Sequence, residues 1–481
     1  MSFNLIECNR EQKFLLPIDM SEWLPGDHLV WFVIDAVETM DLASFYAGVR
    51  ADGWGGAAYD PAMMVSLLLY SYCMGERSSR KIEKLCQCDI AFRVITASHV
   101  PDHSTIARFR QNNGEGLEEL FDEVLRLCAE AGLVKAGLLA LDGTKIGANA
   151  SIDANRAHDY FREEVKKWLR EADEIDAEED RLYGPDRRGD ELPEDLRRPE
   201  DRRRRIEECL ERLNREADEA EAEKQDEIRK REEEEGRSGK KKRGRKPKSP
   251  EKVRAEKERG AKANITDPDS RIMKTRKGYI QGFNAQAAVT KDQVIVAAEL
   301  TQEENDVNQL HPMIEKAIEN LEKAGIDEQV RAVVADAGYL SEDNLKKKSE
   351  EEDGEEEGQG EERKEEEKPE DGPELYIATK KDRKQRAEPQ EQSRDEDTLP
   401  EDLTERQKME RKLATEEGRA IYKKRGQTVE PVFGQIKEGR GFSRFSGRGL
   451  PACTSEWKFM CAVHNLLKLW RAGGSVAQAA A

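Results

Sequence analysis

The chain has 481 residues, of which 36% are hydrophobic and 38% are charged. This length excludes a single small module, and so polar a composition means that much of the chain is solvated helix or disorder rather than packed core. The net charge of −20 argues at first against nucleic acid as a partner. The acidity is regional, however. Residues 350–374 hold 15 acidic and 3 basic residues and residues 156–235 hold 31 and 20, so these two stretches account for more than the whole net charge.

Eight cysteines without a regular spacing are typical of reduced thiols in a cytosolic protein. Cys86 and Cys88 form a CxC pair, but no second pair stands at zinc-finger spacing, so we interpret them as structural thiols. The first residues contain no apolar signal core, and the longest apolar run, residues 63–74, is too short to span a bilayer. We therefore expect a cytoplasmic protein with no membrane partner.

The N-terminal region, residues 1–130, is predicted to be a helical DNA-binding domain. Apolar residues recur at helical spacing from residue 23 to about residue 113, and short helices are expected near 78–86, 89–96 and 104–112, with Ser78 and Ser104 as N-caps. The basic residues of these helices fit a helix-turn-helix-like DNA reader and fit equally well the polar surface of an ordinary helical bundle. They are Arg77, Arg80, Lys81, Arg93, Arg108 and Arg110.

A short apolar run after this region, residues 138–141, ends in Asp142 and predicts a buried strand with a carboxylate at its end. The charge run over 156–235 then predicts a long helical hairpin or coiled-coil arm, for which solvated helix is the default interpretation. It is followed by KKKRGRKPKSP, in which Arg243 and Arg245 flank a glycine. This segment fits a minor-groove hook on DNA or a flexible cationic linker with non-specific phosphate contacts.

Regular structure is predicted again from Gly278. Residues 279–290 and 294–300 form a hairpin, and a helix over 308–324 follows, with Asn305 or Asp306 as its N-cap. Residues 330–335 form a second apolar strand, which ends in Asp336.

The last part of the chain begins with residues 349–374, an acidic low-complexity tract that we expect to be disordered. A final short strand over 375–379 and helices around Glu430 and over 455–470 follow. Pro431 lacks an N–H and suits only a first helical turn, so the helix with Glu430 is expected to begin near Thr428. Glu430 and Lys437 would then share one face, because seven residues are nearly two turns.

Two strand-end carboxylates and one helical carboxylate suit a two-metal phosphoryl-transfer site. Mg²⁺ prefers oxygen ligands, and a pair of ions can activate the attacking oxygen and stabilise the leaving one. Any one of these acids alone would more often be local turn chemistry. It is the order of Asp142, Asp336 and Glu430 among the predicted elements that indicates a catalytic site.

The segments around these acids resemble the motifs of DDE-class bacterial insertion-sequence transposases. LALDGTK around Asp142 is similar to the first motif, and VVADAGYLS around Asp336 is similar to the second. IYKKRGQTVEPVFGQIK is similar to the third, except that four residues rather than three separate its arginine from its glutamate. The residues that match the third motif are Tyr422, Arg425, Glu430 and Lys437.

The resemblance implies a fold and a set of site residues. The fold would be α/β, a ribonuclease H-like mixed sheet flanked by helices, formed by residues 131–155 and 263–470 and interrupted by a charged helical insertion and basic linker at 156–262. Asp142, Asp336 and Glu430 would be catalytic and would hold two Mg²⁺ ions, for which Mn²⁺ can substitute. The expected DNA-binding residues are Lys145, Tyr422, Arg425, Lys437, Arg243 and Arg245, of which Lys145 is assigned from its proximity to Asp142.

The implied function is a DNA transposase that binds terminal inverted repeats, hydrolyses a phosphodiester at each end and joins the freed 3′ end to target DNA. Pairing two ends implies a homodimer or a larger assembly on double-stranded DNA. Two alternatives stay open: a same-fold nuclease without strand transfer, and a catalytically inactive DNA-binding or scaffolding descendant. The presence of all three acids argues against the second alternative.

Overall fold

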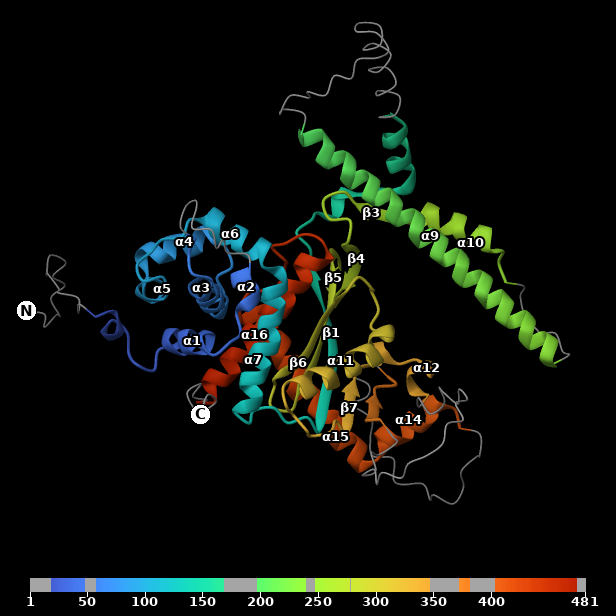
Figure 1. The fold of residues 1–481 in the computed structure, drawn as a ribbon. Coiled ribbons are helices and arrows are strands. Elements are labelled where there is room, and N and C mark those ends of the chain that lie inside the picture. Colours follow the sequence, from blue (N-terminus) through green and yellow to red (C-terminus); the bar gives the residue numbers. More distant parts are fainter. Residues whose placement is uncertain are drawn as a thin grey trace, which may run out of the picture.

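The structure is a computed structural model that describes residues 19–47, 58–167, 197–238, 247–276, 278–346, 372–380 and 403–473. Figure 1 shows three parts: a group of N-terminal helices, a central sheet with helices around it, and a long helical arm. The predicted linker arginines Arg243 and Arg245 lie outside the described residues, as does almost all of the acidic tract. No helix in the described ranges is both long enough and apolar enough to cross a membrane.

The N-terminal helices that the apolar spacing predicts are confirmed. Their bounds are α1 Leu29–Glu38, α2 Ala43–Ala47, α3 Pro61–Cys73, α4 Ser79–Cys88, α5 Ile90–Ile95, α6 His103–Asn112 and α7 Gly114–Glu130, after a 3₁₀ turn η1 at Met20–Glu22. Ser78 is the N-cap residue of α4, as expected. The expectation for Ser104 is wrong, because α6 begins at His103 and Asp102 caps it by accepting hydrogen bonds from the amides of Ser104 and Thr105.

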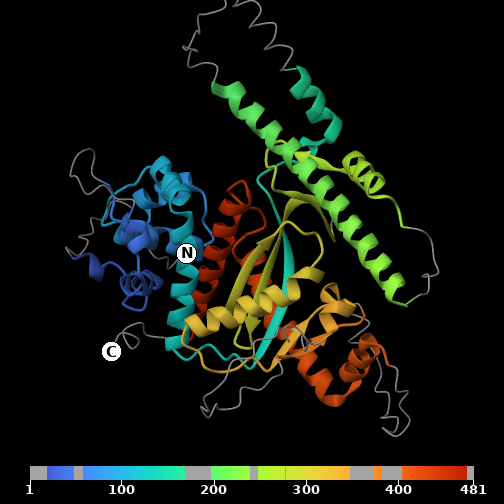
Figure 2. The same cartoon turned by 45° about the vertical axis from the view of Figure 1, so that its right-hand side comes forward.

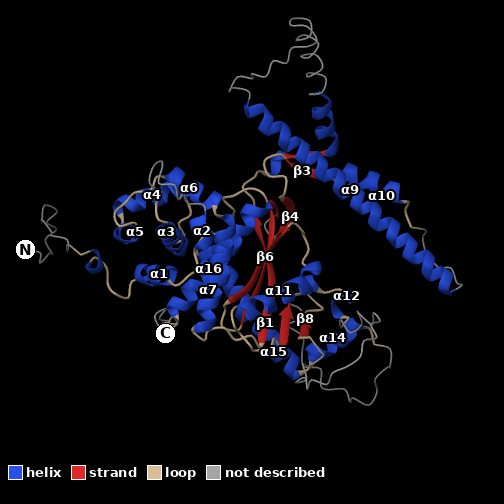
Figure 3. Ribbon diagram, viewed as in Figure 1, coloured by secondary structure: helices blue, strands red, loops and turns tan. Residues whose placement is uncertain are grey.

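The central sheet is mixed, and Figure 3 shows its strands gathered in the middle of the molecule. Strands β4, β5, β1, β7 and β8 follow one another in this order, and β6 pairs with β5 beside β4. The pairs among β4, β5, β6 and β1 are antiparallel, whereas β7 and β8 run parallel to β1. The bounds are β1 Leu138–Gly147, β4 Arg271–Thr275, β5 Gly278–Thr290, β6 Ile295–Thr301, β7 Ala332–Ala335 and β8 Glu374–Ile377. The predicted strands at these places are confirmed, but the expectation that Asp142 ends the first strand is wrong, because β1 continues to pair with β5 as far as Gly147. Strand β4 was not predicted.

Helices cover both faces of the sheet. Figure 2 shows α11 (Leu310–Lys323) crossing the front of the strands and α16 (Leu450–Arg471) behind them. The indole N–H of Trp457 on α16 donates a hydrogen bond to the backbone oxygen of Gln286 on β5, at 3.1 Å, which fixes this helix against a central strand. Shorter elements connect the larger ones. They are η4 Val307–Gln309, η5 Ala337–Tyr339, α12 Glu342–Leu345 and α14 Glu405–Ala414.

Helix α15 begins much earlier than the sequence predicts. It runs over Glu416–Gly434 with Pro431 in its interior, and a π-helical segment η6, Gln435–Gly439, continues it. Thr415 caps its start by accepting from the amide of Gly418, so Thr428 has no such role. Pro431 cannot donate to the carbonyl oxygen of Gln427, four residues earlier, but the side-chain amide of Gln293 donates to this oxygen at 2.9 Å. A hydrogen bond from a neighbouring hairpin thus allows the proline inside the helix.

The charged insertion forms an arm. Helix α9 (Arg197–Ser238) lies against α10 (Pro250–Gly260), which was not predicted, and Arg254 of α10 contacts Asp218 of α9 at 2.8 Å. The arm has a small core of its own, made of Phe161, Ile206, Cys209, Leu213 and Ala263. After η2 (Ile152–Ala154), the short strands β2 (Asn155–Ala157) and β3 (Lys262–Asn264) pair with each other where the arm leaves the sheet.

Arg212 should be essential for the rigidity of the arm. Its buried guanidinium donates to the backbone oxygens of Lys262 and Pro268, and the substitution Arg212→Met would leave both acceptors without this donor. We expect the base of the arm to lose about 1–3 kcal/mol of stability. Hydrogen exchange should show faster exchange in α9 and unchanged exchange in β1 and β5.

Arg204→Met is the matched control, because Arg204 lies on the same helix with its side chain 68% exposed. An exposed ion pair of this kind contributes little, so exchange should not change. Equal protection of α9 in the two variants would contradict a role for Arg212 in anchoring the arm.

Candidate active site

The register of the sheet brings two of the three predicted acids together. Strands β1 and β7 are parallel, with Leu138 beside Ala332 and Ala140 beside Val334. The same offset, carried two residues further, sets Asp142 beside Asp336, which directly follows β7. Paired residues of parallel strands point to the same face of a sheet, so this register favours two neighbouring carboxylates.

Helix α15 brings the third acid to this place through Arg425. The Arg425 guanidinium donates from Nη2 to Oδ2 of Asp142 at 2.9 Å, and its Nη1 lies 3.8 Å from Oε1 of Glu430. The Arg425 side chain is only 4% exposed, whereas that of Glu430 is 47% exposed. Arg425 therefore bridges the first and third acids from inside the protein, and its contact with DNA stays a prediction.

Asp142 lies in an unfavourable setting for a negative charge. Its pKa is raised to about 7, mainly by burial and in smaller part by the nearby carboxylates of Asp336 and Asp306. The Arg425 guanidinium and the amide of Gly143, which donates to Oδ1 at 2.9 Å, act in the opposite direction. The site thus contains more negative charge than its own cations compensate.

Lys437 lies on the same face of β1 as Asp142. Its ammonium donates to Oγ1 of Thr144 and to the backbone oxygen of Lys145, both at 3.0 Å, and Thr144 is two residues from Asp142 along the strand. Burial lowers the pKa of Lys437, and the adjacent Glu438 opposes this shift. The π-helical turn that holds Lys437 changes the helical phase after Glu430, so the predicted shared face does not follow from simple α-helical spacing.

The opposite face of β1 carries Lys145 and an acid that the sequence analysis missed. The Lys145 ammonium lies 3.6 Å from Oδ1 of Asp306, and the same oxygen accepts from the amides of Asn284 and Gln286 at 2.7 and 2.6 Å. Asp306 was predicted as an N-cap, but it precedes η4 and its side chain makes no cap hydrogen bond. Asn305 is not the cap either, since α11 begins only at Leu310, after Gln309. Two amide side chains on one face of an otherwise apolar strand were the signal that a buried polar partner had to exist.

The aromatic residues of the motifs are interior residues. Tyr339 is fully buried and donates its hydroxyl to Oε1 of Gln286, while burial raises its pKa well above the usual value. Tyr422 is also buried, with 6% of its surface exposed. The contact of Tyr422 with DNA stays a prediction.

The carboxylates fit a hard divalent cation in kind, because they offer only oxygen donors and are short of positive charge. Asp142 and Asp336 are adjacent by register, and Glu430 is linked to Asp142 by Arg425. Within the described ranges, however, no three Asp, Glu, His or Cys side chains are gathered closely enough to hold an ion. The Glu430 side chain is 47% exposed, so its place in a metal site with Asp142 and Asp336 stays a prediction.

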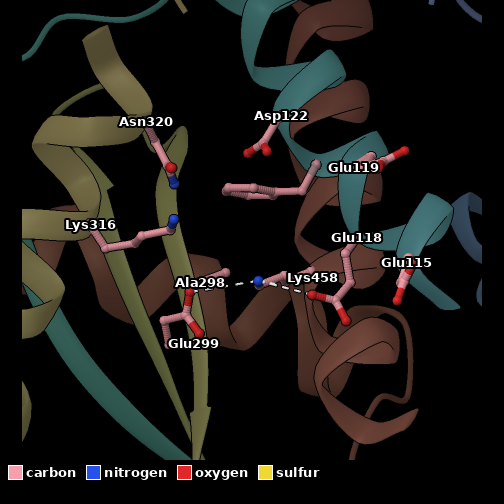
Figure 4. Close-up of a pocket in the computed structure, with 10 residues that line it drawn as sticks. Glu115, Glu118, Glu119, Asp122, Ala298, Glu299, Lys316, Asn320 and Lys458 are labelled. Carbon is pink, nitrogen blue, oxygen red and sulfur yellow. Dashed lines mark hydrogen bonds and ion pairs between the residues drawn. The ribbon is translucent and has the colours of Figure 1, made fainter. Parts of the chain in front are cut away.

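A pocket of about 300 Å³ lies away from these acids, between α7, α11, β6 and α16 (Figure 4). Lys458 stands between Glu118 at 3.0 Å and Glu299 at 3.7 Å. Carboxylates outnumber ammonium groups in its lining, which is unfavourable for a phosphate. None of the predicted site residues lines it, so the pocket and the candidate site are separate.

Two family models match the chain. A transposase domain (DUF772) matches residues 18–112, the region of α1 to α6, and a transposase DDE domain matches residues 379–470, which include Glu430 and Lys437. No curated protein and no solved structure matches the chain. The two matches, one over the N-terminal helices and the other over the region of α14 to α16, indicate a transposase. More narrowly, they indicate a DDE-type transposase of an insertion sequence, and DDE transposases generally use divalent metal ions.

Replacing Asp142 with asparagine should change how stability depends on pH. The folded pKa of about 7 lies above the ordinary value of 3.8, so between these pH values the folded chain keeps a proton that the unfolded chain loses. The wild type therefore loses stability as the pH rises from about 4 to 7, and Asp142→Asn removes this loss. In metal-free buffer, the melting temperature of the variant relative to wild type should rise over this window and level off above it.

Asp343→Asn is the control, since the Asp343 side chain is 91% exposed. Its melting temperature should follow that of the wild type at every pH. A constant difference between Asp142→Asn and wild type from pH 4 to 8 would show that Asp142 has no raised pKa.

Proposed function

We propose that the chain is a DNA transposase that binds terminal inverted repeats, cleaves a phosphodiester at each end and joins the freed 3′ end to target DNA. The observation that carries this proposal is the register that sets Asp142 beside Asp336 on two parallel strands, together with Arg425, which contacts both Asp142 and Glu430. It would act on double-stranded DNA in the cytoplasm.

The strand order supports a ribonuclease H-like catalytic domain over residues 131–155 and 263–470. Strands β6, β5 and β1 form an antiparallel meander in space, and β7 and β8 extend the sheet parallel to β1. The first acid lies on the central strand of this order and the second at the end of its parallel neighbour. This arrangement sets Asp142, midway along β1, beside Asp336 at the end of β7, and a nucleic-acid backbone would have to reach both carboxylates there.

In this proposal the acids bind Mg²⁺ or Mn²⁺, and the other residues position DNA. A pair of divalent ions, held by Asp142, Asp336 and Glu430, would supply activation of the attacking oxygen and stabilisation of the leaving oxygen. Arg425 holds the carboxylates of Asp142 and Glu430 toward one another, and Lys437 lies on the same strand face, where its ammonium can contact a phosphate. Water would attack the phosphorus, the bond to the 3′ oxygen would break, and that oxygen would leave as a 3′-OH. This 3′-OH would then attack the phosphorus of a target phosphodiester, whose own bond to the 3′ oxygen would break, leaving a 3′-OH on the target strand.

The other regions would serve DNA binding and assembly. The helices of residues 1–130 would carry the basic residues that recognise the element ends, and the charged insert at 156–235 would contribute contacts between protomers. Pairing of two ends requires a homodimer or a larger complex. The linker residues Arg243 and Arg245 would contact DNA non-specifically or in the minor groove.

Neutralising each acid in turn tests the catalytic assignment. Asp142→Asn, Asp336→Asn and Glu430→Gln should each lower Mg²⁺-dependent cleavage and strand transfer by roughly 100-fold or more, because each removes a charge that stabilises the transition state. Binding to the inverted repeats should be retained. Oligonucleotides that carry the repeats, followed by gel analysis of nicked and joined products, give both readouts.

Glu417→Gln on the same helix as Glu430 is the control and should retain full activity, since Glu417 is exposed at the far end of α15. Activity of the three variants equal to that of Glu417→Gln would refute the site. Cleavage without any joined product would favour the nuclease alternative, and a wild type that binds the repeats without cutting would favour the inactive descendant.

Shortening the arm tests its role in assembly. Replacing residues 224–247 by a short Gly-Ser loop keeps the small core at the base of the arm and the contact between Arg254 and Asp218. We expect single-end binding within about 3-fold of wild type and a loss of the paired-end complex, as measured by gel mobility and light scattering. Because this deletion also removes Arg243 and Arg245, the double substitution of these arginines by alanine is the control, and it should leave pairing intact. Normal pairing by the shortened protein would contradict a role of the arm between protomers.

A further inference from the structure

A chain of buried and partly buried polar side chains runs from the second motif to the first. We call its members Tyr339, Gln286, Asp306 and Lys145 the polar relay. The Tyr339 hydroxyl donates to Oε1 of Gln286, whose amide nitrogen donates to Oδ1 of Asp306 at 2.6 Å. The Lys145 ammonium lies 3.6 Å from the same Asp306 oxygen. The relay therefore connects the turn after Asp336 with the strand of Asp142.

The Asp306 side chain does not stabilise the turn that follows it. It precedes the 3₁₀ turn η4, but its side chain makes no cap hydrogen bond there. Its partners instead lie on β5 and β1, 20 or more residues away along the chain. Removing a carboxylate from water is costly, and here two amides and one ammonium offset that cost at a single oxygen.

The glycines of the first two motifs leave room for this carboxylate. A Cβ atom at Gly143 would lie 2.6 Å from Oδ1 of Asp306, and a Cβ atom at Gly338 would lie 2.9 Å from Asp336 Oδ1 and 3.2 Å from Asp306 Oδ2. The carboxylate oxygens of Asp306 and Asp336 are thus within about 6 Å of each other. Both glycines have negative φ, so the constraint is space and not backbone conformation. Asp306 is therefore part of the acidic site.

The Lys145 ammonium can donate further hydrogen bonds. Its Nζ is buried, and among the described residues it makes no hydrogen bond, only the ion pair with Asp306. An ammonium has three donors, so an acceptor that enters the site can be bound without breaking an existing hydrogen bond. A non-bridging oxygen of a DNA phosphate is such an acceptor, and its negative charge matches the ammonium.

We propose that Asp306 is a positioning residue of the transposase site, which holds the ammonium of Lys145 where it binds a non-bridging oxygen of the scissile DNA phosphate. Asp306 acts through Lys145 and does not itself contact DNA. Gln286 and Tyr339 fix the orientation of the Asp306 carboxylate from the other side. This inference rests on the proposed function, since it takes the phosphate beside Asp142 and Asp336 as the substrate.

A double-mutant cycle tests whether Asp306 acts through Lys145. Asp306→Asn, Lys145→Met and the double variant are compared with wild type in single-turnover cleavage of inverted-repeat DNA, over a range of DNA concentrations. Each single variant should lower the maximal rate by about 10- to 100-fold, as expected for the loss of a hydrogen bond to a charged group. The DNA concentration for half-maximal rate should stay within about 3-fold, and the double variant should be no slower than Lys145→Met.

The ion pair of Glu118 and Lys458 provides a matched control. Its side chains are 29% and 20% exposed, close to the 19% and 17% of Asp306 and Lys145, and it lies outside the site. Glu118→Gln and Lys458→Met should keep the maximal rate of wild type. If Asp306→Asn does not fold, Tyr339→Phe removes only the far hydroxyl of the relay, and it should slow the wild type several-fold but not the Lys145→Met variant.

Three results would overturn the inference. These are a wild-type rate for Asp306→Asn, multiplicative losses in the double variant, and restoration of Asp306→Asn by raised Mg²⁺, which would make Asp306 an ion ligand instead. Asp142→Asn is included in the same series. If Asp142→Asn also cleaves at the wild-type rate, the proposed function fails, whereas an inactive Asp142→Asn beside a fully active Asp306→Asn refutes only the role of Asp306.

Discussion

The crowding of carboxylates on β1 and directly after β7 is the constraint on which the rest of the site depends. Asp142 lies close to Asp336 and Asp306, and its pKa is raised mainly by burial and also by the charge of these two carboxylates. The protein opposes this repulsion with one cation on each face of β1. Arg425 contacts Asp142 from α15, and Lys145 contacts Asp306 on the other side of the strand. Successive side chains of a strand point to opposite faces of the sheet, so the short first motif can place Asp142 on one face of β1 and Lys145 on the other.

The position of Arg425, which opposes the charge of Asp142, involves segments distant in the sequence. Arg425 contacts Asp142 from α15, a helix that continues past Pro431, and Gln293 at the turn between β5 and β6 donates to the carbonyl oxygen that the proline leaves without its helical donor. Gln293 has a positive φ, which is unusual for a residue other than glycine, and its backbone oxygen also contacts the buried ring of His464 on α16. Gln293 thus links the turn between β5 and β6 to both α15 and α16.

The sequence was sufficient for most of the elements and for the order of the acids. Strand-end positions, apolar runs and helical spacing are local signals, and they located β1, β5, β6 and β7 and the helices of the N-terminal region.

The predictions failed where a residue distant in the sequence makes a contact that local sequence rules do not include. Asp102 took the cap expected of Ser104, Gln293 compensated for Pro431, and α10 formed in a segment read as linker because α9 lies beside it. Asp306 was predicted to be a helix N-cap from its position in the sequence. Only the fold shows that its side chain instead accepts hydrogen bonds from the distant residues Asn284 and Gln286. The contacts of Arg425 with Asp142 and Glu430 could not be predicted either, because the spacing between Arg425 and Glu430 differs from that of the family motif.

The catalytic domain tolerates so long and so charged an insertion because the ends of the insertion are already paired. Strands β2 and β3 join Asn155 to Asn264, so the chain leaves and re-enters the domain at one place and little loop-closure entropy is lost. The small core around Phe161 and Leu213 stabilises the arm without apolar area from the main sheet. Such an insertion can change its length and charge without disturbing β1, and for this reason the net charge of the whole chain says little about the surface near Asp142. Because the arm is independent of the main sheet, it can affect the site only through movement of its base. At this base Arg212 of α9 donates to the backbone oxygens of Lys262 and Pro268, on either side of Asn264.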